Sequence, residues 1–235
     1  MNLNVVELRQ YTLRPGQRDV LIELFDREFV TTQEEVGIRV LGRFRDEDRP
    51  DRFVWLRAFP DMDARREALT AFYVHGAAWR EHSAAARATM LDTSDALLLR
   101  PTSFSGPIMP PGSTRVAITV YHLATDADEF VGFFEETVAP VLAATGAPPL
   151  ACFRTEPAEN TYPALPVRTG ENVFVWLAAF PDEEHHREHE RRLAEVWQQV
   201  PPDLTDRVSR TQHLRLSPTA GFLSNPRAGH ASLRT

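Results

Sequence analysis

Apolar and polar residues alternate in some stretches of the first hundred residues and follow helical spacing in others. In the stretch 4–13, the apolar Val6 and Leu8 alternate with the charged Glu7 and Arg9, which is typical of a strand. The predicted strands are 4–13, 40–45, 52–59 and 96–100, and the predicted helical regions are 19–35 and 63–90. Their order, β-α-β-β-α-β, is that of a ferredoxin-like unit.

One stretch of nine residues occurs twice. Residues 53–61 read FVWLRAFPD and residues 174–182 read FVWLAAFPD, so eight of nine positions agree. Each copy predicts a buried strand that ends at its proline and leads into a charged run, at 63–67 and 183–188, typical of the exposed face of a helix. The later residues repeat the whole pattern, with strands at 116–123, 150–155, within 174–182 and at 212–216, and helices at 126–144 and 183–199.

The repeat predicts tandem domains. They are a first ferredoxin-like domain at 1–101, a linker rich in proline and glycine at 102–114, a second ferredoxin-like domain at 115–218, and a flexible tail at 219–235. The two hairpin loops differ, because the second, near Glu156–Gly170, is about 12 residues longer. Its prolines predict an ordered, irregular flap.

Two units of this kind can cover each other. A four-stranded sheet with helices on one side leaves its other face open, and two such sheets packed face to face close into an α/β barrel. We therefore expect an α+β fold of the dimeric α/β-barrel type, built from tandem repeats. The sequence leaves two arrangements open: the halves of one chain close the barrel, or the chain pairs with a second copy in a homodimer.

Composition restricts the partners. The chain is 43% hydrophobic and 25% charged, as in ordinary globular proteins, and its formal net charge is −7. This charge argues against nucleic acid or an anionic membrane surface as the main partner. There is one cysteine, and no run of about 18 apolar residues that would span a membrane. We expect a cytoplasmic protein that binds a small molecule.

Candidate chemistry lies on two predicted strands. Glu7, Arg9 and Tyr11 alternate onto one face of the first strand, and Trp55 and Arg57 share a face of the repeated strand, its expected neighbour. We expect this patch to face the barrel interior and to form a polar pocket, with Tyr11 as a catalytic residue and the other four binding substrate. The alternative is a salt-bridge network that only satisfies the sheet.

A second group surrounds Gly76, which predicts a break in the helical region. Tyr73, His75, Trp79 and His82 flank it, and histidine titrates in the range that suits a general acid or base. We expect His75 and His82 to be catalytic and Tyr73 and Trp79 to bind substrate. In the alternative interpretation, Trp79 is a core residue and His82 faces solvent.

The second half matches the first half only in part. Tyr121 and Trp176 correspond to Tyr11 and Trp55 and are predicted to bind substrate. The ionic positions become Ala117, Thr119 and Ala178, so we expect an asymmetric site centred on the first half.

Metal and cofactor signals are weak. His185, His186 and His189 lie in a helix otherwise rich in Glu and Arg, which favours a solvated surface, with a zinc site as the open alternative. Cys152 has no evident histidine partner and is predicted to be a buried structural thiol. The chain has no phosphate loop, dinucleotide fingerprint or HExxH motif, and we expect no cofactor.

Several stretches resemble the NIPSNAP family of the dimeric α/β-barrel superfamily. They are ELRQYTLRPG at 7–16, FVWLRAF at 53–59, FYVHGAAWREH at 72–82, ATM at 88–90 and LLLRP at 97–101. The resemblance covers most of 4–101 and is weaker across 115–218. It implies mainly a fold, and superfamily relatives include cofactor-independent monooxygenases, haem enzymes, lyases and isomerases.

From these observations we expect a small-molecule enzyme without a nucleotide cofactor in bacterial secondary or catabolic metabolism. The reaction would be that of a lyase, an isomerase or cyclase, or a cofactor-free oxygenase. The alternatives are a non-catalytic ligand-binding or scaffold protein and a barrel that binds haem through a histidine.

Overall fold

The computed structural model describes residues 3–104, 108–197 and 203–223. In the first half, β1 (Val5–Leu13) is followed by a helical segment, a β-hairpin and a second helical segment. These are α1 (Arg18–Leu24), a π-helical turn (Phe25–Phe29) and α2 (Val30–Glu35); β2 (Arg39–Asp46) and β3 (Arg52–Phe59); then α3 (Met62–Thr70), a π-helical turn (Ala71–His75) and α4 (Ala77–Thr89). The short β4 (Met90–Asp92) and β5 (Ala96–Phe104) complete this half.

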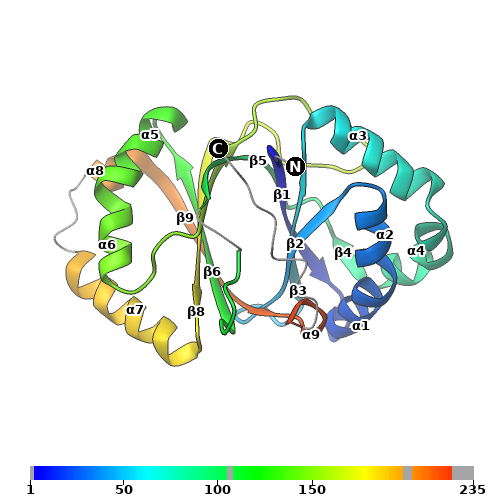
Figure 1. The fold of residues 1–235 in the computed structure, drawn as a ribbon, viewed down its shortest axis with the longest axis horizontal. Helices are drawn as coiled ribbons and strands as arrows, with labels where there is room; N and C mark the ends of the chain where they lie inside the picture. Colours follow the sequence, from blue (N-terminus) through cyan, green and yellow to red (C-terminus); the bar gives the residue numbers. More distant parts are fainter. Residues whose placement is uncertain (1–2, 105–107, 198–202, 224–235) are drawn as a thin grey trace.

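The second half repeats this order. It consists of β6 (Arg115–Leu123), α5 (Ala127–Phe133), a π-helical turn (Phe134–Val138), α6 (Ala139–Ala144), β7 (Ala151–Thr155), β8 (Val173–Phe180), α7 (Glu183–Trp197), α8 (Asp203–Arg207), β9 (Val208–Pro218) and α9 (Ala220–Leu223). The predicted α+β fold with tandem ferredoxin-like units is confirmed. The helices of the two halves lie on opposite sides of the strands (Figure 1).

Eight strands close into one barrel within the single chain. Each half contributes a four-stranded antiparallel sheet, and the halves join where β2 pairs with β9 and β5 pairs with β7. At these junctions Arg45 lies opposite Ser217, and Leu99 lies opposite Thr155. Closure leaves no free barrel edge, so the barrel is complete without a second chain.

The barrel interior is packed with apolar side chains, which corrects one expectation. Val6, Leu8, Val54 and Leu56 belong to the interior cluster together with the matching aliphatic residues of the second half. Glu7, Arg9, Tyr11, Trp55 and Arg57 face the opposite way, toward the helices. An eight-stranded barrel is just wide enough for side chains to fill, and its inward-facing polar residues Gln10, Arg52 and Gln212 lie at one end, where Arg52 Nη1 donates to Gln10 Oε1 at 2.8 Å.

β5 and β9 extend further than the sequence pattern predicts. Pro101 does not end β5, which continues to Phe104 with an irregular step in its pairing with β7 between Pro101 and Ser103. Such a step accommodates a residue that has no N–H to donate. β9 is longer than the predicted 212–216 at both ends.

The predicted tail also begins too early. Phe222 on α9 is buried in the interior cluster, and its ring centroid lies 5.7 Å from that of Phe44. Residues 219–223 are therefore part of the packed fold, with the buried Thr219 N–H donating to the Arg43 carbonyl at 3.0 Å, and residues 224–235 lie outside the described residues.

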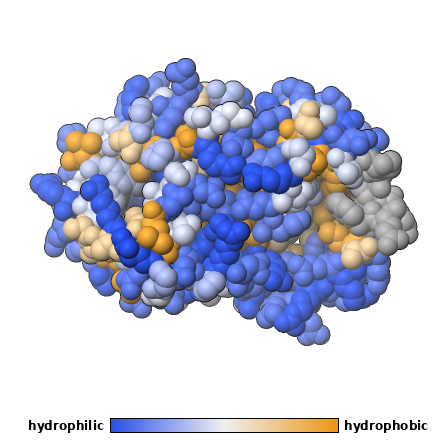
Figure 2. Space-filling model, turned by 180° about the vertical axis from the view of Figure 1, so that it is seen from behind, coloured by the Kyte–Doolittle hydropathy of each residue, from blue (hydrophilic) through white to orange (hydrophobic). Residues whose placement is uncertain are grey.

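The outer surface is mostly polar on the face shown in Figure 2, where hydrophobic residues form small, separate groups. None of the helices in the described ranges is long and apolar enough to cross a membrane.

Candidate functional site

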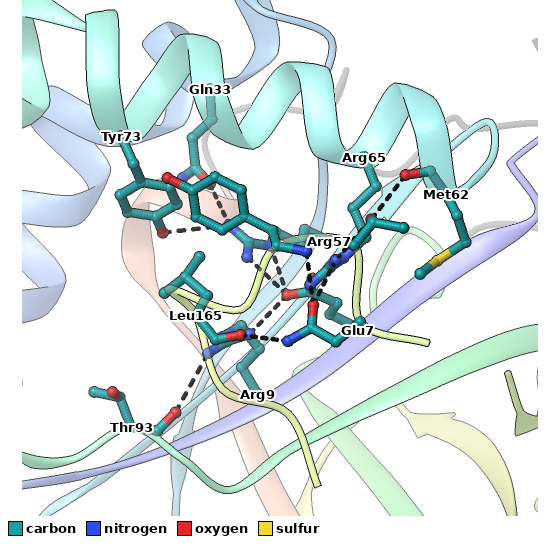
Figure 3. A network of polar contacts seen from close by, with 12 residues as sticks. Glu7, Arg9, Gln33, Arg57, Met62, Arg65, Tyr73, Thr93 and Leu165 are labelled. Carbon is teal, nitrogen blue, oxygen red and sulfur yellow. Dashed lines mark hydrogen bonds and ion pairs between the residues drawn. The ribbon is translucent and has the colours of Figure 1, made fainter. Parts of the chain in front are cut away.

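Four charged side chains meet under the helices of the first half. Glu7 on β1 lies at the centre, and its carboxylate accepts from Arg9 Nη1 at 2.8 Å, Arg57 Nε at 2.9 Å and Arg65 Nε at 2.6 Å. Arg57 comes from β3 and Arg65 from α3, and all four side chains are fully buried (Figure 3). The predicted patch therefore does form a salt-bridge network, joined by Arg65, which was predicted to lie on an exposed helix face.

This cluster carries excess positive charge. Burial by itself would raise the pKa of the Glu7 carboxyl, but the charges of Arg57, Arg9 and Arg65 outweigh burial and hold that pKa far below its usual range. One carboxylate thus balances only one of three guanidinium groups. Buried charges are costly unless paired, so an unbalanced cluster favours a negatively charged group nearby.

Two tyrosines lie between the cluster and open space. Arg9 Nε donates to the hydroxyl of Tyr11 at 3.1 Å, and Arg57 Nη1 donates to that of Tyr73 at 3.3 Å. Burial raises the pKa of Tyr73 although Arg57 opposes this, so this phenol keeps its proton. Because each hydroxyl oxygen accepts from an arginine, each O–H can donate to a ligand.

A cavity of about 310 Å³ lies above these hydroxyls. Its walls are mostly aromatic and aliphatic, and the residues are Tyr11, Leu21, Phe25, Phe29, Gln33, Trp55, Phe72, Tyr73, Trp79, Arg87, Met90, Thr93, Tyr162, Ala164, Leu165 and Pro166. The indole N–H of Trp55 is buried and has no hydrogen-bond partner in the described part of the chain. Trp55 therefore adds a third donor to the two phenols.

The flap of the second half forms one wall of this cavity. Its Tyr162 and Leu165 line the space, and Arg65 Nη1 donates to Asn160 Oδ1 at 3.0 Å. The hydroxyl of Thr161 donates to the Met62 carbonyl at 3.0 Å. An ordered, irregular loop was predicted here, but its contact with the first half was not, because loop sequence carries no signal for a distant partner.

The structure brings some predicted residues together and separates others. Tyr11, Trp55, Tyr73 and Trp79 line the cavity, and Glu7, Arg9 and Arg57 lie beneath it. The helix breaks at Gly76 as predicted, where ψ is 127°, and only glycine fits this position because a Cβ would lie 2.3 Å from the Phe72 carbonyl oxygen.

The two predicted catalytic histidines lie outside the cavity wall. His75 is exposed, and His82 lies beside Glu28, with 3.4 Å between its Nε2 and the Glu28 carboxylate. Tyr121 and Trp176 lie on the equivalent outer face of the second half.

Across the described residues, no group of three or more His, Cys, Asp and Glu side chains is placed to hold a metal ion. Cys152 is buried, as predicted, and burial raises the pKa of its thiol to about 12.

The low pKa of Glu7 predicts sensitivity to acid. An unfolded glutamate has a pKa of about 4.3, so the stabilisation is fully present above that pH. It is lost as the pH falls below about 4.3 toward the folded pKa. We expect the free energy of unfolding, measured by urea titration, to decrease steadily in this range. A Glu7→Gln variant should lose this component, and an unchanged pH slope in that variant would contradict the assignment.

Known proteins resemble the chain in sequence and fold. The NIPSNAP family profile matches residues 6–106. No curated protein matches the sequence.

Three solved structures resemble the chain over nearly its whole length. Two proteins named "putative monooxygenase", from Fusobacterium nucleatum and Lactobacillus acidophilus, are each 11% identical over 92% of this chain and 93% of theirs, with TM-scores of 0.63 and 0.56. An anthrone oxidase-like protein is 9% identical over 92% of this chain and 91% of its own, with a TM-score of 0.57. At these identities, the likeness establishes the two-repeat barrel fold.

Proposed function

Residues 6–106 form a NIPSNAP family domain, and from its cavity we propose that the chain is a cofactor-free oxygenase that binds an aromatic substrate as its anion. The observation that carries the proposal is that a net-positive buried cluster, three hydrogen-bond donors and an aromatic cavity lie next to one another in this order. The donors are the hydroxyls of Tyr11 and Tyr73 and the indole N–H of Trp55. The names of the full-length structural relatives support the same reaction class.

The proposed substrate is an aromatic ketone with an activated CH₂ group, as in an anthrone. Loss of one proton from that carbon gives an enolate whose charge rests largely on oxygen. The three donors would hold this oxygen, and the arginines beneath them would lower the pKa of the bound substrate. Among the described residues that line the cavity there is no histidine, aspartate or glutamate, and in this proposal the proton passes to solvent.

Oxygenation then needs only dioxygen. The anion gives one electron to O₂, and the resulting radical combines with superoxide to form a carbon–oxygen bond. The peroxide takes up a proton, its O–O bond breaks, and the carbon loses its second hydrogen. Overall, CH₂ and O₂ become C=O and H₂O. The missing base disfavours lyase or isomerase chemistry on a weakly acidic substrate, because such reactions need a proton acceptor close to the carbon.

An oxygen electrode tests this proposal with anthrone as substrate and a metal chelator present. We expect consumption of one O₂ per anthraquinone formed, above the uncatalysed rate and insensitive to the chelator. Binding of the anthrone anion without O₂ uptake would instead support the non-catalytic binding protein. Absence of binding would contradict the assignment of the cavity.

A further inference from the structure

A second cavity, of about 710 Å³, lies on the outer face of the second half between α7 and strands β6, β8 and β9. It shares two wall positions with the first cavity but lies nearer the last strand: β9 lines it in place of the first helical segment, and no described residue of α5 or α6 contributes. Tyr121 and Trp176 line it, as Tyr11 and Trp55 line the first. The strand register is also repeated, since Tyr121 lies opposite Phe174 and Tyr11 lies opposite Phe53.

The ionic cluster has no counterpart here. Ala117, Thr119 and Ala178 stand where the first half has Glu7, Arg9 and Arg57. The floor of the second cavity is therefore uncharged, although its aromatic wall is kept. A buried, uncharged floor disfavours an ionic ligand, because nothing compensates the loss of hydration.

Histidines supply the polar groups instead. His186 and His189 from α7 and His213 from β9 all line the cavity. The ring of His186 stacks on Phe180 with centroids 4.4 Å apart. Burial lowers the pKa of both His186 and His189, so both rings are neutral at pH 7.

The hydrogen bonds of His189 fix its tautomer. His189 Nδ1 lies 3.4 Å from the backbone carbonyl oxygen of Thr145, which can only accept, so this nitrogen is the donor. The Thr145 hydroxyl lies 3.0 Å from the same nitrogen, and its single proton is shared between the carbonyls of Val141 and Leu142 at 3.1 and 3.0 Å. The proton therefore lies on Nδ1, and Nε2 is left as an acceptor. His213 Nδ1 lies 3.1 Å from the Thr119 hydroxyl.

One buried donor in this cavity lacks a well-formed hydrogen bond. The indole N–H of Trp176, a residue only 3% exposed, makes no hydrogen bond of normal length and angle within the described residues, although the Tyr121 hydroxyl is close enough to interact with it. A buried N–H normally finds an acceptor, so this group points to a ligand oxygen. The site thus offers a donor from Trp176 and an acceptor from His189 between apolar walls that include Leu193.

We propose that this second cavity binds an uncharged, hydroxylated aromatic molecule, separately from the anion site of the first half. A phenolic O–H can donate to a neutral imidazole, and its oxygen can accept from the Trp176 N–H. The charged residues at the rim are Asp48, Glu190 and Arg215, with Arg215 paired to Asp48. This leaves one net negative charge that repels an anion. The inference does not depend on catalysis in the first half.

Titration with 1-naphthol and 1-naphthoate, followed by NMR of the histidine rings, tests the proposal. Naphthol should shift the signals of His189 and His213, and naphthoate should not. The exposed His75 is the internal reference and should stay unshifted. Naphthol titration without a shift at His189 and His213, or equal shifts from both ligands, would overturn the proposal.

Two variants localise the binding. Leu193→Trp, on the accessible helix wall, should fill the cavity and raise the Kd for naphthol, read from the histidine shifts, at least tenfold. Trp176→Phe keeps the ring but removes the donor, and should raise this Kd by roughly three- to tenfold. Val131→Trp, on the half-buried surface of α5 and not among the cavity residues, is the matched control and should leave this Kd unchanged. Naphthol shifts that persist in Leu193→Trp would contradict the site.

Discussion

Replacing Glu7 by glutamine should lower the free energy of unfolding by about 3–5 kcal/mol, because it leaves three buried guanidinium groups without their shared counter-charge. Glutamine has nearly the same shape, so lost packing contributes little. The effect should be large because the Glu7 side chain and those of Arg9, Arg57 and Arg65 have no solvent contact. Urea unfolding at pH 7 measures it.

Glu188→Gln is the matched control. Glu188 also pairs with two arginines, Arg191 and Arg192, but all three lie exposed on α7. Exposed ion pairs contribute about 0–1 kcal/mol, so this variant should be nearly as stable as the parent protein. If Glu7→Gln and Glu188→Gln lost the same free energy of unfolding, the buried cluster would stabilise the fold no more than an exposed ion pair does.

Replacing Tyr11 by phenylalanine should reduce kcat/KM for anthrone oxidation roughly a hundredfold, the usual effect of losing one donor to a developing oxyanion. Phenylalanine keeps the ring packed against Trp55, whose centroid lies 5.9 Å away. Trp55→Phe should act in the same direction. Initial rates of O₂ consumption measure both effects.

His82→Gln separates the two assignments of the catalytic group. If the sequence-based prediction of a histidine acid or base were right, this variant would lose most of its activity. From its position beside Glu28, outside the cavity wall, we expect a change of less than about twofold. Loss of activity in His82→Gln with full activity in Tyr11→Phe would overturn the site proposed here.

The repeat made the fold predictable from the sequence. Eight identical residues in a stretch of nine located one of the two central strands of each unit, and the element order identified the ferredoxin-like architecture. The direction of each strand face was not predictable, because β3 is buried along its whole length. The alternating pattern shows that Val54 and Leu56 lie on one face of β3 and Trp55 and Arg57 on the other. Because both faces are covered, the pattern does not show which face points into the barrel.

The site itself was predictable only in part. The alternating pattern identified the site residues on β1 and β3. Arg65 was missed because it lies in a charged run on α3, which predicted a solvent-exposed helix face. Its burial depends on Glu7, 58 positions earlier, which no local pattern reveals. The aromatic wall given by Tyr162 likewise depends on a long-range contact of the flap.

The flap has a consequence for the history of the duplication. Copying a domain normally frees one copy to diverge while the other keeps its task. Here the longer loop of the second half forms a wall of the first cavity, and Arg65 of the first half donates a hydrogen bond to Asn160 of this loop. The first half without this loop would lack one wall of its cavity, so the two copies depend on each other for this site.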